Sequence, residues 1–332
     1  GPAMPLLKEI VPRFTGKRIL VVGDIILDHF LWGTVSRISP EAPVPVVNVQ
    51  REDLLLGGSA NVLRNIVSLG GSGALCGMIG DDAMGHRTEA LVEALGASRA
   101  GMVRGGRPTT VKTRVVAQGQ QVVRVDREQT GVPERATLDL LLAFLEAHLH
   151  EFDAVLVSDY AKGVVNEELM TRLRQLLDTV RAEGGRPVPL IVDPKPVNLH
   201  YFTGATVITP NHHEAAQMAG LRVDDERSLL AAAHHIREDL GCAAVLITRG
   251  EAGMALLEGD GDALGVGVTE GDGANGSGTG AAGAGSGAGG VLTGEGIASA
   301  EIVGVAAATD AESGGDVTRT ARNPTTGIAS AI

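Results

Sequence analysis

The feature that most constrains the fold is the alternation of short apolar runs with longer segments of helical periodicity. Five runs bounded by turn residues predict buried strands at 19–22, 154–157, 190–192, 206–208 and 244–248. Helical periodicity predicts amphipathic covering helices over 134–151, 167–183 and 226–240. Strands that alternate with helices form mostly parallel sheets covered on both faces. We therefore expect an α/β protein with a doubly wound, mostly parallel sheet.

Two segments, about 30–50 and 109–126, interrupt this alternation. Both contain period-2 patterns typical of strands, such as Val-Lys-Thr-Arg-Val at 111–115, and prolines at 43 and 45 mark edge positions. We interpret them as a small separate sheet that acts as a lid. Exposed apolar strands often pair with a second subunit, so we expect a homodimer formed through the lid strands.

Composition excludes several classes of protein. The formal net charge of −12 argues against nucleic-acid and membrane-surface partners, which require a basic surface. Cys76 and Cys242 are too few and too far apart for a disulfide framework or a zinc site, which favours a cytoplasmic protein. No run approaches the roughly 20 apolar residues of a membrane helix. Residues 1–3 resemble a protease scar, and we expect one domain over 4–332 that acts on a small molecule.

A glycine pair followed by a helical pattern is the first candidate binding element. Gly57 and Gly58 would let backbone approach a ligand closely, and Asn61 and Asn65 would share one face of the helix that follows. The alternative is an ordinary loop before a helix. Asp24 and Asp28 follow the strand at 19–22, where ligands bind in open α/β sheets, and their carboxylates suit sugar hydroxyls.

Three further strand ends carry polar groups that suit a nucleotide. Asn211 and Glu214 follow the strand at 206–208 with a spacing that could hold the waters of Mg²⁺, or could form a helix cap. A glycine-bearing turn follows the strand at 244–248, and a plain hairpin turn is its alternative interpretation. The remaining candidates are Thr248, Gly250 and Gly253 in this turn, and Asp193 and Lys195 after the strand at 190–192.

Basic residues gather around the expected lid: Arg104, Arg107, Lys112, Arg114, Arg124 and Arg127. Guanidinium groups match the oxygens of a phosphate, so this concentration indicates a substrate that is already phosphorylated. Strand alternation places Lys112 and Arg114 on the same face. A solvated charged ribbon is the alternative.

These residues resemble the ribokinase-like carbohydrate kinases over nearly the whole chain from Arg18. The segment from Gly57-Gly58 to Gly70-Gly71 matches that family's first signature, and Asn211 to Glu214 matches its magnesium-associated motif. Residues 23–29, 36–46, 158–163 and 192–195 narrow the resemblance to the D-glycero-β-D-manno-heptose-7-phosphate kinases. That group uses ATP and Mg²⁺ to phosphorylate the anomeric oxygen, giving heptose 1,7-bisphosphate for ADP-heptose and lipopolysaccharide core synthesis.

The resemblance implies a role for each candidate residue. It places these near the sugar phosphate: Asp24, Asp28, Gly57, Gly58, Asn61, Asn65, Lys112, Arg114 and Lys162. It places these near the nucleotide: Asp193, Lys195, Asn211, Thr248, Gly250, Gly253, Gly278 and Gly280. Asn211 and Glu214 would hold Mg²⁺ through water. A dinucleotide-binding dehydrogenase is disfavoured, because no Gly-x-Gly-x-x-Gly follows the first strand.

The tail from 259 to 332 departs from the family pattern, although it covers the position of the elements that close the nucleotide site. It contains 20 glycines, and the family's Gly-Ala-Gly-Asp motif falls on Ser-Gly-Thr-Gly-Ala at 277–281, so Ala281 stands where the family has its aspartate base. Three explanations stay open. The chain is a sugar-binding pseudokinase; Asp272 replaces the base; or the tail residues result from a misassignment or frame change, which we favour because the other motifs are intact.

Overall fold

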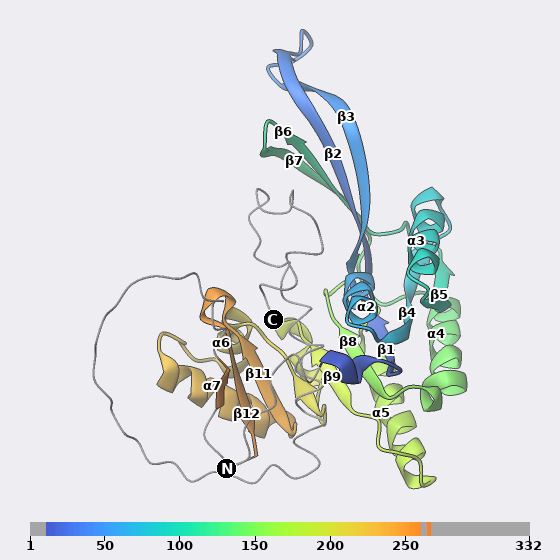
Figure 1. Cartoon of the computed structure of the whole chain (residues 1–332), viewed down its shortest axis with the longest axis vertical. Helices are drawn as coiled ribbons and strands as arrows, with labels where there is room; N and C mark the ends of the chain where they lie inside the picture. Colours follow the sequence, from blue (N-terminus) through green and yellow to red (C-terminus); the bar gives the residue numbers. More distant parts are fainter. Residues whose placement is uncertain (1–10, 260–263, 267–332) are drawn as a thin grey trace.

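A large twisted sheet forms the body of the protein (Figure 1), for which the computed structural model describes residues 11–259 and 264–266. Among these residues the sheet has nine strands, in the order β13 (Leu264–Val266), β12 (Met254–Glu258), β11 (Ala244–Thr248), β10 (Val207–Ile208), β9 (Leu190–Asp193), β8 (Ala154–Ser158), β1 (Arg18–Gly23), β4 (Ser72–Gly80) and β5 (Ser98–Gly105). The neighbouring strands in the series β11, β10, β9, β8, β1, β4 and β5 pair in parallel, and β12 and β13 add antiparallel pairs at one edge. The mostly parallel sheet expected from the sequence is confirmed.

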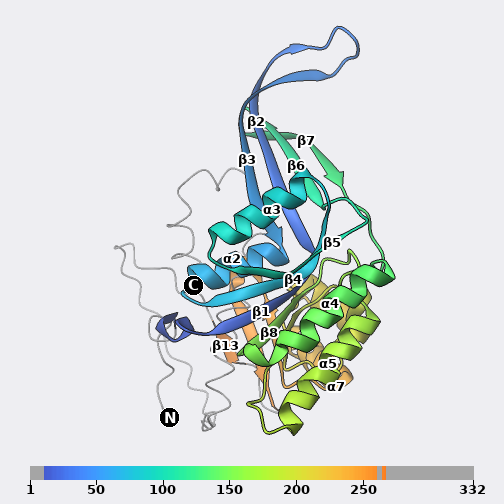
Figure 2. The ribbon, with the colours of Figure 1, turned by 90° about the vertical axis from the view of Figure 1, so that its right-hand side faces the viewer.

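Helices cover both faces of this sheet (Figure 2). Alternate side chains of β1 pack on opposite faces of the sheet. Leu20 and Val22 belong to a core cluster with the helices of one face, α4 (Arg135–His148), α5 (Glu167–Ala182), α6 (His212–Ala219) and α7 (Glu226–Leu240). Ile19 and Val21 point the other way, into a cluster with α2 (Ser59–Ser68) and α3 (Ala83–Ala94). Because successive side chains of a strand face opposite sides, a continuous apolar run produces a strand buried on both faces.

Helices α3, α5, α6 and α7 begin where the sequence supplies a side-chain cap. Asn166 accepts the amide of Leu169 at the start of α5, and Asp225 forms a capping box with Ser228 at the start of α7. The first predicted helix is two elements, α4 and the 3₁₀ turn η2 (Leu149–Glu151). Further 3₁₀ turns are η1 (Val11–Phe14), η3 (Pro196–Tyr201) and η4 (Gly250–Ala252). No described helix is both long and apolar enough to cross a membrane.

A second sheet extends away from the body as an arm (Figure 1). Its order is β3 (Pro45–Gly58), β2 (Ile25–Ile38), β6 (Val111–Ala117) and β7 (Gln120–Arg127). We call this sheet the lid. Its first two strands are longer than the expected segment 30–50, because β2 starts directly after Asp24 and β3 continues to Gly58. The glycine pair therefore ends a strand of the lid and is not an isolated loop.

Candidate functional site

The carboxyl ends of neighbouring parallel strands bring the predicted polar residues to one edge of the large sheet. Asp24 follows β1, Asp159 follows β8, Asp193 ends β9, and Thr248 ends β11. Asn211 joins this edge through a bridge to Thr248. The strand order places the β1 and β8 ends beside the lid, and the β10 and β11 ends at the far side. The edge is where open α/β sheets bind ligands.

Asp24 organises the loop that follows β8. Its Oδ2 accepts the backbone amides of Tyr160 (2.9 Å) and Lys162 (3.1 Å), and its Oδ1 accepts the amide of Val164 (3.1 Å). The side chain is 2 % exposed, and burial raises the pKa of Asp24 against the opposing effect of these amides. The structure thus uses this carboxylate to shape the loop beside the site, and its contact with a sugar stays a prediction.

The glycine pair joins the lid to α2 with little free space. Gly58 has a φ of +56° at the N-cap of α2, where a Cβ would lie 2.5 Å from the carbonyl oxygen of Asp24. Just beyond it, Ser59 and Asn61 are buried, and neither Ser59 Oγ nor Asn61 Oδ1 has a hydrogen-bond partner among the described residues. Buried polar atoms are usually paired, so these two fit a ligand that carries hydroxyl groups. Asn65 lies one turn farther along α2 and is half-buried.

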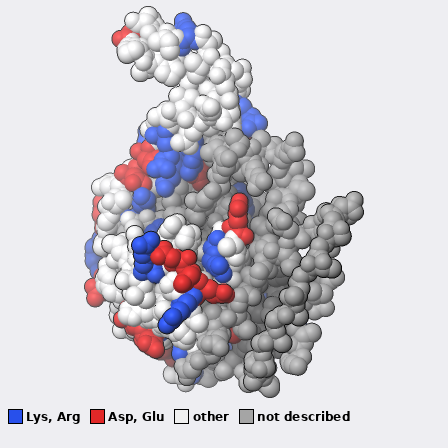
Figure 3. Space-filling view, turned by 90° about the vertical axis from the view of Figure 1, so that its left-hand side faces the viewer, with Lys and Arg blue, Asp and Glu red and all other residues white. Residues whose placement is uncertain are grey.

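A lid cation pairs with Asp28 beside this glycine pair. Arg114 Nη1 lies 2.5 Å from Asp28 Oδ1, and Lys112 is the neighbour of Asp28 in the β2–β6 ladder. Burial, and then the charge of Lys162, lower the pKa of Lys112. Lys162 itself pairs with Glu128 at 2.7 Å. An anion bound between Lys112 and Lys162 would reduce the repulsion between their ammonium groups. Figure 3 shows basic side chains gathered where the lid meets the body.

Two of the six basic residues expected around the lid, Arg104 and Arg107, lie outside the lid strands, so the prediction was wrong for these two. Arg104 lies on β5 of the large sheet and pairs with Glu89 at 2.7 Å. Arg107 is 8 % exposed and donates to the backbone carbonyls of Gln129, Gly131 and Val132, which ties the two chain segments at the base of the lid together. Such an arginine has a structural role, because carbonyls already occupy its guanidinium.

Asn211 and Glu214 form the capping box that was the alternative interpretation of their spacing. Asn211 Oδ1 accepts the amide of Glu214 at 2.9 Å, and Glu214 Oε2 accepts the amide of Asn211 at 3.0 Å. Lys195 Nζ lies 2.6 Å from Glu214 Oε1. Although burial alone would lower it, this hydrogen bond raises the pKa of Lys195.

This donor set has limited room for a metal. Each oxygen of Glu214 already accepts one hydrogen bond, and a carboxylate oxygen has room for about two. The pair therefore fits the water shell of Mg²⁺ better than direct coordination. Within residues 11–259 and 264–266, no group of three or more His, Cys, Asp or Glu side chains could hold a metal ion.

The turn after β11 is a hairpin that leads into β12. Arg249 donates its amide to the carbonyl of Gly253 at 2.8 Å, and Gly250 and Gly253 both have positive φ. Thr248 is buried at the start of the turn. These three predicted nucleotide residues are thus at the same sheet edge as Asn211. The predicted Gly278, Gly280, Ala281 and Asp272 lie outside the described residues.

Sequence reasoning missed Asp159, which lies between the two groups of predicted residues. Its Oδ1 accepts the amide of Ala161 at 2.8 Å, and its Oδ2 accepts the amide of Lys195 at 3.2 Å and Asn198 Nδ2 at 2.9 Å. Burial raises the pKa of Asp159 to about 6 against these hydrogen bonds. The available signal was its place directly after the apolar run at 154–157, which is the position that Asp24 has after 19–22.

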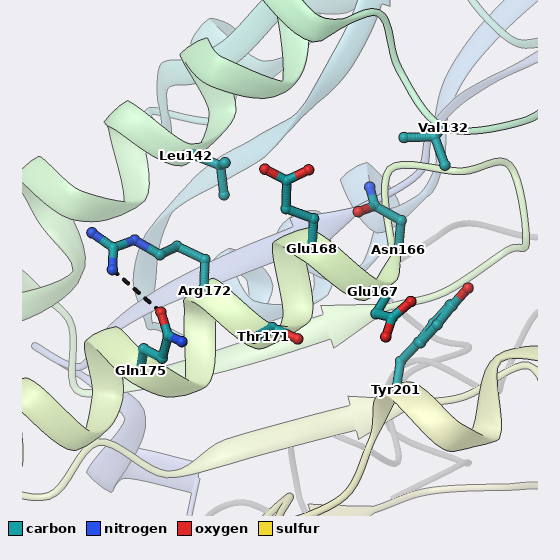
Figure 4. Close-up of a pocket in the computed structure, with 9 residues that line it drawn as sticks. All are labelled: Val132, Leu142, Asn166, Glu167, Glu168, Thr171, Arg172, Gln175 and Tyr201. Carbon is teal, nitrogen blue, oxygen red and sulfur yellow. Dashed lines mark hydrogen bonds between the residues drawn. The ribbon is translucent and has the colours of Figure 1, made fainter.

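A cavity of about 620 Å³ lies elsewhere on the body and contains none of the predicted residues (Figure 4). It is lined mainly by the first turns of α5, with Glu167, Glu168 and Arg172, and by Tyr201 of η3. Arg172 Nη1 donates to Gln175 within it. Its lining is of mixed charge, and it does not contribute to the site at the sheet edge.

Comparisons with known proteins agree with this geometry. The pfkB family of carbohydrate kinases matches residues 17–313. A bifunctional protein HldE of Citrifermentans bemidjiense is 41% identical over 261 residues, which are 78% of this chain and 52% of that protein. A D-beta-D-heptose 7-phosphate kinase of Bordetella bronchiseptica is 42% identical over 244 residues, 74% of each chain. The chain thus spans about half the length of the HldE proteins it matches.

Solved structures show the same fold at low sequence identity. Phosphofructokinase-2 of Escherichia coli superposes with a TM-score of 0.59 at 18% identity, over 77% of this chain and 80% of that one. Ribokinase of Arabidopsis thaliana superposes with a TM-score of 0.55 at 17% identity, over 76% and 78%. The large sheet with a separate lid is therefore a ribokinase-like fold.

Proposed function

Because the chain belongs to the pfkB family of carbohydrate kinases, we propose that it transfers the γ-phosphate of ATP to the anomeric hydroxyl of D-glycero-β-D-manno-heptose 7-phosphate. The product would be heptose 1,7-bisphosphate, a precursor for ADP-heptose and lipopolysaccharide core. The similarity to a heptose 7-phosphate kinase at 42% identity supports this choice of sugar.

One juxtaposition in the site carries the proposal. Unpartnered buried oxygens of Ser59 and Asn61 lie beside a glycine pair, and that pair adjoins the lid cations Lys112 and Arg114. The first group suits hydroxyls and the second suits an anion, so together they favour a phosphorylated sugar. Arg114 would exchange Asp28 for the substrate phosphate.

ATP would lie at the far end of the same edge. Asn211 and Glu214 would hold the waters of Mg²⁺, which neutralises charge on the phosphates, and Thr248, Gly250 and Gly253 would line the nucleotide beside Asp193 and Lys195. In the transfer, the bond from the γ-phosphorus to the β,γ-bridging oxygen breaks and a bond to the anomeric oxygen forms. The proton of the anomeric hydroxyl needs an acceptor, which in the family is an aspartate at the position where this chain has Ala281.

The proposal is tested by introducing an aspartate at position 281, where the family has its base. ADP release with heptose 7-phosphate is measured for the unchanged chain and for Ala281→Asp, with ³¹P NMR to identify an anomeric phosphate. A general base contributes about 10²- to 10⁴-fold, so Ala281→Asp should raise the rate within this range. Absence of turnover by Ala281→Asp refutes the proposal. Peptide mass spectrometry over 259–332 establishes first which tail the protein carries.

The second candidate, a catalytically silent pseudokinase that binds the sugar phosphate, is favoured by Ala281 alone. It predicts that the unchanged chain binds heptose 7-phosphate in calorimetry and consumes no ATP. Turnover by the unchanged chain, or absence of sugar-phosphate binding, would exclude it.

We also propose a cytoplasmic homodimer that pairs through the lid. Large exposed apolar side chains gather on the lid strands, among them Val49, Val123 and Val125. A surface of this kind on a thin sheet favours burial against a second copy.

A further inference from the structure

Asp159 lies between the two ends of the site and contacts the loop after β8 and the segment after β9. It is 1 % exposed and both of its oxygens accept hydrogen bonds from separate chain segments. Its own amide donates to the carbonyl of Asp193 at 3.0 Å. A carboxylate has no proton to donate when ionised, so this side chain can act only as a shared acceptor that fixes the positions of its donors.

On one side, Asp159 begins the loop that meets the base of the lid. Gly131, which follows β7, donates its amide to the carbonyl of Lys162 at 3.1 Å. Gly163 fits so closely that a Cβ would lie 1.8 Å from the carbonyl oxygen of Gly131. The Lys162–Glu128 ion pair adds a third contact. A displacement of the lid base therefore moves this loop, because there is no free space between them.

On the other side, Asp159 fixes the segment after β9. Its Oδ2 accepts the amide of Lys195 and Asn198 Nδ2, which sets where the Lys195 side chain begins. Lys195 Nζ in turn lies 2.6 Å from Glu214, the N3 residue of the α6 capping box. A continuous set of hydrogen bonds thus runs from the lid base to the start of α6.

We infer that Asp159 is a positioning residue that holds the Lys195–Glu214 pair in register with the lid-bearing loop, and so couples sugar binding to nucleotide binding. The inference rests on the proposed function for the identity of the two ligands. Coupling between sites requires an element that both ligands bias, and the loop at 159–164 is that element. Without the Asp159 carboxylate, the donors of two segments lose their common acceptor.

Binding measurements test the coupling with the full chain. Calorimetry gives the Kd of a non-hydrolysable ATP analogue with and without saturating heptose 7-phosphate. We expect coupling of about fivefold or more in the unchanged chain, falling to about onefold in Asp159→Asn. Asn198→Ala should reduce it partly, because the Lys195 amide keeps its acceptor. Asp178→Asn, an exposed acid on α5, should leave it unchanged. Absence of coupling in the unchanged chain, or equal coupling in Asp159→Asn, refutes the inference.

A second measurement is independent of activity and of the ligands. Acetic anhydride acylates amines that are free to react, so the contact of Lys195 Nζ with Glu214 Oε1 at 2.6 Å slows the labelling of Lys195. Peptide mass spectrometry should show labelling of Lys195 that is faster by about threefold or more in Asp159→Asn. Lys17, which precedes β1 at the end of the strand opposite to the site, should be unchanged and is the internal reference. Faster labelling of both lysines would mean general loosening and would refute a specific role.

These readouts separate the inference from the proposed function. If heptose 7-phosphate is not phosphorylated by Ala281→Asp but the Lys195 labelling responds as expected, the proposed reaction is wrong and the positioning role stands. If phosphorylation occurs while the labelling of Lys195 and the coupling of the two ligands are both unchanged in Asp159→Asn, the positioning role is wrong and the reaction stands.

Discussion

A Cβ atom on residue 57 would lie 2.1 Å from Asp28 Oδ2, so Gly57 and Asp28 can occupy neighbouring places only because residue 57 has no side chain. Arg114 holds the same carboxylate from the β6 side, through Oδ1. The position of Asp28 is thus set by a glycine on one side and a guanidinium on the other.

Substituting Gly57→Ala should displace Asp28 and weaken sugar-phosphate binding. We expect KM for heptose 7-phosphate to rise about tenfold or more, with a loss of about 1–3 kcal/mol in the free energy of unfolding from overpacking. Steady-state kinetics and urea denaturation measure both. The double variant Gly57→Ala with Asp28→Ala removes the clash and should recover most of the stability without recovering KM. Unrecovered stability would place the clash elsewhere.

Arg114→Met should raise KM for the sugar phosphate more than it lowers kcat. The substitution keeps an unbranched side chain over the Phe30 ring, where the guanidinium now lies 5.3 Å from the centroid, but removes the charge. Loss of a charged hydrogen bond costs about 1.5–3 kcal/mol, equivalent to about 10- to 100-fold in KM. Arg172→Met, on α5 outside the site, is the matched control. A kcat effect alone would contradict a binding role.

Asp82 secures the base of the lid, and Asp82→Ala should destabilise the protein by about 2–4 kcal/mol. Its carboxylate accepts the amide of Gly85 at 2.8 Å, and the amide (2.9 Å) and hydroxyl (2.7 Å) of Thr109. Burial would raise its pKa, but these hydrogen bonds outweigh burial and lower the pKa of Asp82 below the ordinary 3.8. A lowered pKa adds stability above pH 3.8, which is lost as pH falls through the folded value. The difference in the free energy of unfolding between the unchanged chain and Asp82→Ala, measured by urea denaturation at several pH values, should therefore shrink in acid. A difference that stays constant would contradict this.

Asp159 should give the opposite pH dependence. Burial, with the neighbouring charge of Asp24, raises its pKa from 3.8 to about 6, while the amides of Ala161 and Lys195 oppose the shift. The folded state then binds a proton that the unfolded state has released between these values, so stability should fall by about 3 kcal/mol as pH rises through this window and stay level above it. Denaturation of the unchanged chain and Asp159→Asn at several pH values measures this difference. A difference independent of pH would refute it.

Charge on the exposed lid valines should separate the proposed dimer. Val123 and Val125 are 48% and 56% exposed, and because they are two residues apart they share one face of β7. Val123→Asp with Val125→Asp would place two carboxylates in the proposed interface, and sedimentation should then report a monomer. Val197→Asp, at a 70% exposed position of η3, is the control. A dimer that survives the lid substitutions would place the interface elsewhere.

The sequence predicted elements well where a single period dominates. The run at 19–22 is apolar throughout, and β1 is buried on both faces as that pattern requires. The start of β2 was harder to predict, because Asp24, Asp28 and His29 interrupt its apolar pattern with polar residues. Asp24 and Asp28 are tolerated because the loop after β8 and the lid cation Arg114 supply their partners, which lie far away in the sequence.

Arg107 and Asp159 show what pattern alone leaves undecided. Sequence placed Arg107 with the lid cations, but its acceptors are carbonyls about 20 to 25 residues away, which no local pattern specifies. Asp159 was recognisable as a polar residue after a strand. Its contacts with Lys195 and Asn198 arise only because β8 and β9 are neighbours.

By itself, the sequence determined the α/β alternation, the strands that end in polar residues and the existence of a separate lid, because periodicity and turn residues act locally. Only the tertiary structure decided that β1 lies between β8 and β4, that Gly57 leaves room for Asp28, and that one carboxylate joins the lid base to Lys195. Strand order and side-chain partners depend on how distant segments pack and satisfy buried polar groups, and that information is spread over the whole chain.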